Sequence, residues 1–126
     1  SRGDWSSDVC SSDLKIKNKI IALPPTEIVT HNDFFDYNAK YKGESDEITP
    51  AQLTKDQTNL IQELSKKIYK ILDLKGFSRS DFILRNNNFY FLEINTNPGL
   101  TKESILPQQA ISYGISLKEL FKSLIN

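Results

Sequence analysis

The chain has 126 residues, of which 38% are hydrophobic, and its 16 Lys and Arg residues balance 16 Asp and Glu residues. This charge balance lacks the basic surface of a nucleic-acid or membrane binder, and no apolar run reaches the roughly 18–20 residues of a membrane span. One Cys and one His exclude a disulfide framework and a four-ligand Cys/His zinc site. The single thiol is compatible with the reducing cytoplasm, so we expect a cytoplasmic protein, and the length predicts one domain.

The beginning of the chain, residues 1–14, differs in composition from all that follows. It holds the only Trp and the only Cys, and it shows neither helical nor strand periodicity. It resembles translated cloning or sequencing-adaptor sequence, which lies outside a fold. We therefore expect a non-native or disordered tail at residues 1–14 and a domain at residues 15–126.

The first half of the domain predicts strands, a loop and a helix in that order. Residues 16–28 favour two β segments separated by a Pro-Pro pair. The polar, aromatic-dotted stretch at residues 34–47 has no regular period and predicts a long loop. Apolar residues then recur at intervals of three and four, which predicts a helix that begins at Pro50 or about a turn later and ends before Gly76.

The second half predicts a hairpin followed by two helices. Residues 80–84 and 89–94 are rich in β-favouring side chains and flank three asparagines, the pattern of a β-hairpin. A helix over residues 104–113 follows, and a capping box of Ser116 and Glu119 opens the last helix. This order predicts the α+β class, with an antiparallel β-sheet packed against helices.

The predicted hairpin brings acidic side chains together. Because side chains alternate across a strand, Glu93 and Asn95 share one face of the second strand and Tyr90 takes the other. If the three asparagines form the loop, Asp81 lies opposite Glu93 and Arg79 lies opposite Asn95. A loop with an even number of residues moves the two carboxylates to opposite faces.

Two interpretations of this acidic pair follow from the residues. Two carboxylates directly opposite each other repel, unless a cation lies between them. Carboxylate and amide oxygens suit Mg²⁺ or Mn²⁺, and Arg79 beside them suits a phosphate oxygen, which together indicate metal-assisted phosphoryl chemistry. The other interpretation is a solvated surface network in which Arg79 bridges Asp81 and Glu93. Similarly, Gly99 in the next turn either allows a ligand close to the backbone or belongs to an ordinary strand-to-helix turn.

Together, these motifs resemble the C-terminal part of the D-alanine–D-alanine ligases, which belong to the ATP-grasp family. The resemblance rests on four stretches in the same order and spacing: LPPTEI at 23–28, FDYNAKY at 35–41, GFSRSDF at 76–82 and LEINTNPGLTKES at 92–104. It implies the fold of a C-terminal ATP-grasp subdomain. Because the family's N-terminal and central domains have no counterpart here, we expect this chain alone to be inactive.

The resemblance also implies a reaction for the complete enzyme. ATP phosphorylates the carboxylate of one D-alanine to an acyl phosphate, and the amine of a second D-alanine attacks it, giving D-alanyl-D-alanine for peptidoglycan synthesis. The implied cofactors are two Mg²⁺ or Mn²⁺ ions, with ATP as co-substrate. The implied enzyme is cytoplasmic and homodimeric, and binds neither nucleic acid nor membrane.

Residue roles carry over by position. The resemblance implies that Asp81, Glu93 and Asn95 hold the ions. It implies that Arg79 stabilises the transferred phosphoryl group and that the N–H of Gly99 donates to the oxyanion, as preorganised donors do.

The remaining implied roles concern the two D-alanines and the closing loop. Ser104 and Ile105 meet the second D-alanine near its carboxylate. Lys40 and Tyr41 lie on a loop that closes over the substrates and excludes water, and Lys40 also contributes to substrate binding. This Lys-Tyr pair favours the dipeptide product over that of the D-alanine–D-lactate ligases, which depart from it. Two alternatives stay open: another ATP-grasp ligase of that type, and a non-catalytic cation-binding module.

Overall fold

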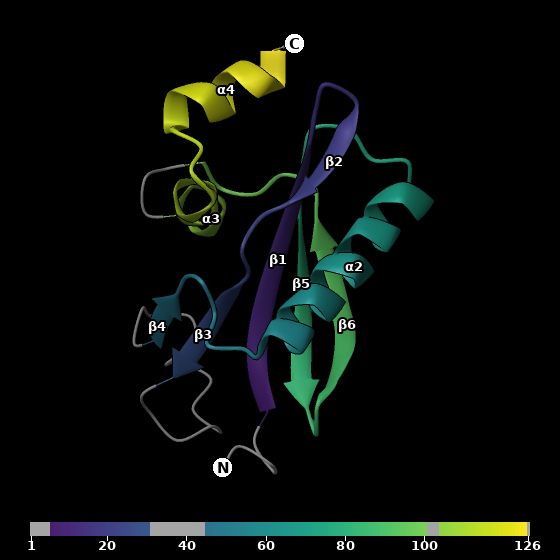
Figure 1. Cartoon of the computed structure of the whole chain (residues 1–126), viewed down its shortest axis with the longest axis vertical. Helices are drawn as coiled ribbons and strands as arrows, with labels where there is room; N and C mark the ends of the chain where they lie inside the picture. Colours follow the sequence, from purple (N-terminus) through teal and green to yellow (C-terminus); the bar gives the residue numbers. More distant parts are fainter. Residues whose placement is uncertain (1–5, 31–44, 101–103, 126) are drawn as a thin grey trace.

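The computed structural model describes residues 6–30, 45–100 and 104–125. Its elements are β1 (Ser6–Ile16), β2 (Lys19–Ala22), β3 (Thr26–Thr30), β4 (Ser45–Ile48), α2 (Lys55–Ile71), β5 (Phe77–Arg85), β6 (Asn88–Asn95), α3 (Ile105–Tyr113) and α4 (Leu117–Ile125). Within this part of the chain the strands form one antiparallel sheet of order β4-β3-β1-β5-β6, with β2 also paired to β1. Helix α2 crosses the sheet, and α3 and α4 lie on the other side of β1 from α2 (Figure 1). The α+β prediction is confirmed.

Strand β1 is the centre of the sheet, so the expectation of a disordered tail is wrong for residues 6–14. Nine consecutive residues, from Ser6 to Leu14, pair with β5. On its other edge β1 pairs first with β3 and then with β2. Composition misled the prediction because this segment becomes a strand by pairing with β2, β3 and β5. Its own residues do not reveal that pairing.

Polar side chains of β1 are buried. Ser11, Ser12 and Asp13 are fully inaccessible to solvent. The carboxylate of Asp13 accepts a hydrogen bond from the hydroxyl of Ser65 on α2. Within the described residues, the hydroxyls of Ser11 and Ser12 and the second oxygen of Asp13 find no hydrogen-bond partner. A buried polar group without a partner lowers the stability of a fold by roughly 1–3 kcal/mol. These side chains therefore destabilise the sheet of which β1 is the central strand.

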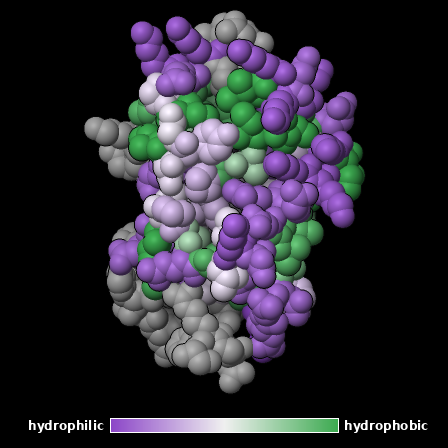
Figure 2. Space-filling view, viewed as in Figure 1, coloured by the Kyte–Doolittle hydropathy of each residue, from purple (hydrophilic) through white to green (hydrophobic). Residues whose placement is uncertain are grey.

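The two faces of the sheet carry separate cores. On one face, Val9 and Phe82 pack with Ala51 and with Ile61 of α2. On the other face, a second core joins the sheet to α3 and α4 through Leu14, Leu23, Phe77, Leu106, Ala110, Ile115 and Leu120. Figure 2 shows that hydrophilic side chains cover much of the outward surface of α2. Because side chains alternate along β1 and β5, the residues next to Val9 and Phe82 point away from α2.

The helices agree with the predictions made for them. Helix α2 begins at Lys55, after a capping box that the sequence analysis missed, and ends before Gly76 as expected. Helix α3 ends at Gly114, which has the left-handed φ of 107°. The predicted box before α4 is present, since the hydroxyl of Ser116 accepts from the N–H of Glu119 at 3.2 Å. No helix in the described part of the chain is long and apolar enough to cross a bilayer.

The turn between β5 and β6 has two residues rather than the predicted three. Arg85 pairs with Asn88, so only Asn86 and Asn87 form the turn. Their φ angles of 50° and 66° lie in the left-handed region, as a type I′ turn requires. Asn tolerates this region better than most residues, which explains why asparagine occupies both positions.

Replacing Asn87 by Ala is expected to lower the free energy of unfolding by about 1–2 kcal/mol, because an Ala held at positive φ is strained by roughly that amount. The change also removes the hydrogen bond from Gln57 to Asn87, which spans 2.9 Å. Asn87→Gly removes the same bond without the strain, and its loss should be smaller. Urea unfolding of the three proteins measures both effects. Equal losses for Ala and Gly would contradict the strain argument.

Candidate functional site

A β-bulge aligns the acidic pair. Below the two-residue turn, the pairing would place Asp81 opposite Leu92, but Phe82 pairs with Phe91 and Asp81 pairs with Glu93. Leu92 is therefore the extra residue of the bulge. The predicted opposition of Asp81 and Glu93 is confirmed, although the predicted loop length was wrong, because the bulge compensates for the shorter turn.

The bulge also changes the expected faces of β6. Tyr90 pairs with Ile83 of β5. Ile83 shares a face with Asp81 because the two are two residues apart on one strand. Tyr90 thus lies on the same face as Asp81, and the expectation that it takes the face opposite Glu93 is wrong. Arg79 pairs with Asn95 as predicted.

Arg79 and Asp81 form a two-pronged ion pair. The Nε of Arg79 donates to Oδ1 of Asp81 at 3.0 Å, and Nη2 donates to Oδ2 at 3.2 Å. The side chains are 23% and 17% exposed, respectively. Burial lowers the pKa of Arg79, but the hydrogen bonds and charge of Asp81 outweigh burial, so the pKa of Arg79 is raised overall. The guanidinium therefore remains charged at the edge of the site.

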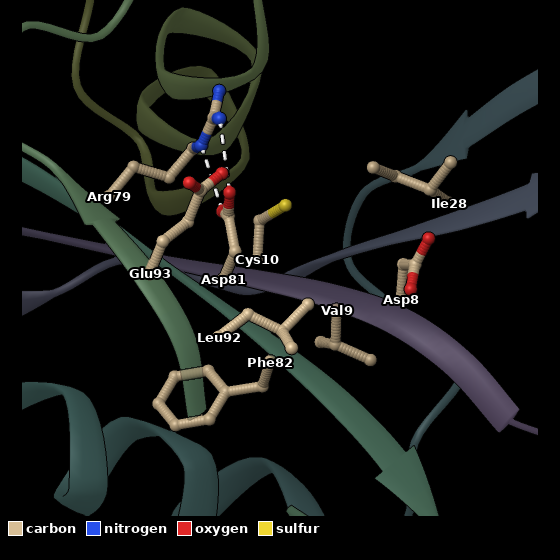
Figure 3. Close-up of a pocket in the computed structure, with 9 residues that line it drawn as sticks. All are labelled: Asp8, Val9, Cys10, Ile28, Arg79, Asp81, Phe82, Leu92 and Glu93. Carbon is tan, nitrogen blue, oxygen red and sulfur yellow. Dashed lines mark hydrogen bonds and ion pairs between the residues drawn. The ribbon is translucent and has the colours of Figure 1, made fainter. Parts of the chain in front are cut away.

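A pocket of about 290 Å³ surrounds this ion pair (Figure 3). Its lining residues come from four strands: Asp8, Val9, Cys10, Ile28, Arg79, Asp81, Phe82, Leu92 and Glu93. In Figure 3 the side chains of Arg79, Asp81 and Glu93 gather in one part of the pocket, apolar side chains lie beside them, and the carboxylate of Asp8 lies near Ile28, away from the ion pair. Charged groups beside apolar surface suit a ligand that has both kinds of surface.

Cys10 belongs to the pocket, and the sequence analysis missed it. It is the β1 residue directly opposite Asp81 and is 3% exposed. Burial, and then the negative charge of Asp81, raise the pKa of the Cys10 thiol, so the thiol stays neutral. The signal was lost because residues 1–14 were assigned to a tail, whereas β1 is the strand that flanks Asp81.

The three predicted metal ligands are neighbours in the sheet but do not form a complete cage. Asp81 and Glu93 lie opposite each other, and Asn95 is two residues further along β6. The side-chain oxygen of Asn95 accepts from the N–H of Asn97 at 2.9 Å and so holds the following turn. In the described part of the chain, no group of three His, Cys, Asp or Glu residues can hold a metal ion. The donor chemistry, two carboxylates and an amide, still fits Mg²⁺ or Mn²⁺. Since both oxygens of Asp81 accept from Arg79, a cation on Asp81 competes with this ion pair.

Gly99 and Ser104, predicted separately, lie in contact. A Cβ added to Gly99 would lie 2.7 Å from Oγ of Ser104 and 3.3 Å from its Cβ. Ser104 is the N-cap of α3, and Ile105, the first residue of the helix, is 9% exposed. The turn after β6 therefore packs its backbone against the beginning of α3. The other two predicted residues, Lys40 and Tyr41, lie outside the described residues.

Replacing Gly99 by Ala is expected to lower the free energy of unfolding by about 1–3 kcal/mol, because the added methyl group overlaps Oγ of Ser104. Ser104→Ala should recover part of this loss when both changes are present. A double-mutant cycle measured by urea unfolding gives the coupling energy between the two positions. Additive losses would show that the added methyl group does not press on Ser104.

The fold is that of the C-terminal ATP-grasp domain of ligases. The D-Ala:D-Ser ligase VanG from Enterococcus faecalis superposes with a TM-score of 0.81 at 33% identity, covering 94% of this chain and 35% of that chain. The D-alanine–D-alanine ligase from Bacillus anthracis complexed with ATP superposes with a TM-score of 0.76 at 25% identity, covering 94% of this chain and 36% of that chain.

Sequence comparison gives the family. A model of the family described as D-ala D-ala ligase C-terminus matches residues 9–126, and the chain belongs to this family. The D-alanine–D-alanine ligase of Flavobacterium johnsoniae is 54% identical over 112 residues, which are 89% of this chain and 35% of that protein. The ligase of Christiangramia forsetii is 53% identical over 109 residues, 86% of this chain and 33% of that protein. The chain thus spans about a third of the length of these relatives, and the predicted resemblance is confirmed.

Proposed function

We propose that this chain supplies the residues for phosphoryl transfer in the active site of an ATP-dependent ligase that joins two D-alanines for peptidoglycan synthesis. The observation that carries the proposal is the opposition of Asp81 and Glu93 beside Arg79, in a chain of the D-alanine–D-alanine ligase family. An acidic pair next to a guanidinium fork provides the two kinds of group that a triphosphate and its cations need. The proposal includes a homodimeric, cytoplasmic enzyme when the domain is joined to the rest of the ligase.

In this proposal Asp81, Glu93 and Asn95 hold two Mg²⁺ or Mn²⁺ ions. Bound cations neutralise phosphate charge and so favour transfer of a phosphoryl group to a carboxylate. When Asp81 holds a cation, Arg79 gives up its two hydrogen bonds to Asp81, and its planar fork of N–H groups is then available to phosphate oxygens. The exposed backbone of Gly99 donates its N–H to the oxygen that becomes negative when the amine attacks.

In this proposal the amino-acid end of the site consists of the N-terminus of α3 together with Lys40 and Tyr41. Ser104 lies at the N-terminus of α3, where the helix dipole favours a carboxylate, and we assign it with Ile105 to the second D-alanine. Lys40 and Tyr41 are assigned to the loop that covers the substrates, and Lys40 also to substrate binding. Exclusion of water protects an acyl phosphate from hydrolysis until the amine attacks.

A second candidate function is an ATP-grasp ligase with a different second substrate. The structural likeness to a D-Ala:D-Ser ligase favours it, because that protein shares this fold at 33% identity. A D-alanine–D-lactate ligase is a further form of the same alternative. The three ligases differ in the second substrate: D-alanine and D-serine attack the acyl phosphate through an amine, D-lactate attacks through a hydroxyl, and each gives a different product.

A chimeric ligase tests the proposal. Residues 9–126 of this chain, which match the family model, replace the corresponding segment of the Flavobacterium johnsoniae ligase, which is 54% identical to this chain over 112 residues. We expect ADP release that depends on D-alanine, with D-alanyl-D-alanine as the product. D-Serine and D-lactate, each added with D-alanine, distinguish the second candidate by the product formed. A folded chimera that binds ATP but releases no ADP with any of the three would contradict the proposed function.

A further inference from the structure

A buried glutamine joins α3 to the central strand. Gln109 is fully inaccessible to solvent, and its Nε2 donates to the backbone carbonyl of Cys10 at 3.1 Å. Its neighbours on the helix, Leu106 and Ala110, pack in the hydrophobic core between α3, α4 and the sheet. A glutamine is costly among such neighbours unless its amide is hydrogen-bonded. Within the described residues its Oε1 has no hydrogen-bond partner, so the bond to β1 is what compensates for burial of this amide.

The bond lies where β1 changes its neighbour. Pairing of β1 with β3 ends at Cys10, and pairing with β2 begins at Asp13. Pro24 and Pro25 lie in the connection between β2 and β3, and proline has no N–H to offer to a strand. In this connection the N–H of Leu23 donates to the carbonyl of Ser12 at 2.9 Å, and the side chain of Gln109 donates to the carbonyl of Cys10, the last β1 residue paired with β3.

This contact connects the two parts of the proposed site, the acidic pair on the sheet and Ser104 at the beginning of α3. Cys10 pairs with Asp81, so the carbonyl that accepts from Gln109 belongs to the strand residue beside the acidic pair. Gln109 lies five residues after Ser104, on the same helix. We propose that Gln109 is a positioning residue: it fixes the N-terminus of α3, with Ser104, relative to Asp81 and Glu93. The inference rests on the proposed function and adds to it a residue that touches no substrate.

The test compares Gln109→Met with Gln108→Met in the chimeric ligase. Met has a similar length and no donor, so Gln109→Met removes the bond to β1. Gln108 precedes it on the helix and donates to Glu47 at 3.2 Å instead. For Gln109→Met we expect the KM for the second D-alanine to rise about tenfold, the effect of one lost buried hydrogen bond. The KM for ATP and kcat should stay within about twofold, and Gln108→Met should leave all three unchanged.

Hydrogen exchange of the 126-residue chain provides a readout that needs no activity. In Gln109→Met, protection factors at residues 108–111 should fall about tenfold while those of β5 and β6 stay unchanged. An unchanged KM, or a KM for ATP that rises in the same proportion, would overturn the positioning role. A uniform fall in protection across the sheet would do the same. An inactive parent chimera counts against the proposed function, and exchange then decides whether Gln109 holds α3 in place.

Discussion

Glu93→Gln in the chimeric ligase is expected to lower kcat by roughly 10²–10³-fold, because several kcal/mol of charge stabilisation depend on the cations that this carboxylate helps to hold. Gln keeps the shape and one acceptor oxygen but removes the negative charge opposite Asp81. The concentration of Mg²⁺ at half-maximal activity should rise as well. Steady-state kinetics over a Mg²⁺ titration at saturating ATP and D-alanine measures both changes.

Stability provides a contrast with activity for the same variant. Two opposed carboxylates repel in the absence of a cation, so removing the charge of Glu93 should leave the free energy of unfolding of the 126-residue chain unchanged or slightly higher. Glu63→Gln, at an exposed position on α2, is the control for loss of one charge. A Glu93→Gln enzyme with kcat within threefold of the parent and the same Mg²⁺ dependence would leave Arg79, Asp81 and Glu93 as an ordinary surface network.

The free energy of unfolding of the chain is expected to fall by about 4 kcal/mol between pH 4 and pH 8 through Asp13 alone. Burial raises the pKa of Asp13 from 3.8 to about 7, against the opposing effects of the Ser65 hydrogen bond and the charge of Lys66. A pKa that is higher in the folded state means that the folded protein holds the proton more tightly. The stabilisation is therefore complete below about pH 4 and is lost as the pH rises through about 7.

Asp13→Asn isolates this effect. The amide oxygen can still accept from Ser65, but it does not ionise. Urea unfolding at a series of pH values should give similar stability for the two proteins at pH 4 and an advantage for Asn of about 4 kcal/mol at pH 8. Glu63→Gln again controls for charge. Parallel stability curves for Asp13→Asn and the unchanged chain would show that Asp13 ionises freely in the fold.

Local signals predicted most of the elements. The helices were predictable because caps and apolar spacing act within a few residues, as at Gly114 and the Ser116–Glu119 box. The central strand was not predictable, because β1 holds polar residues such as Asp13 and depends on ladders to distant strands. Its position in the sheet follows from pairing, which the order of its own residues does not reveal.

The site was predicted in part, and for a reason that needed correction. Asp81 and Glu93 lie opposite each other as expected. The sequence did not reveal that the turn is one residue shorter or that β6 has a bulge, and the effects of these two features on the register offset each other. The close approach of Gly99 to Ser104 depends on how the turn packs against α3, and the contribution of Cys10 depends on β1. Such contacts between distant segments are set by tertiary packing.

The extra residue in β6 has a consequence for how this domain can vary among its relatives. Eleven residues separate Asp81 from Glu93, and they can place the two carboxylates opposite each other in two ways: a two-residue turn with the bulge at Leu92, or a three-residue turn without a bulge. At this hairpin length, a change of one residue in the turn without a change in the bulge would move Glu93 to the other face of the hairpin. Homologues that have the same hairpin length and keep both carboxylates should therefore have either the short turn with the bulge or the longer turn without it.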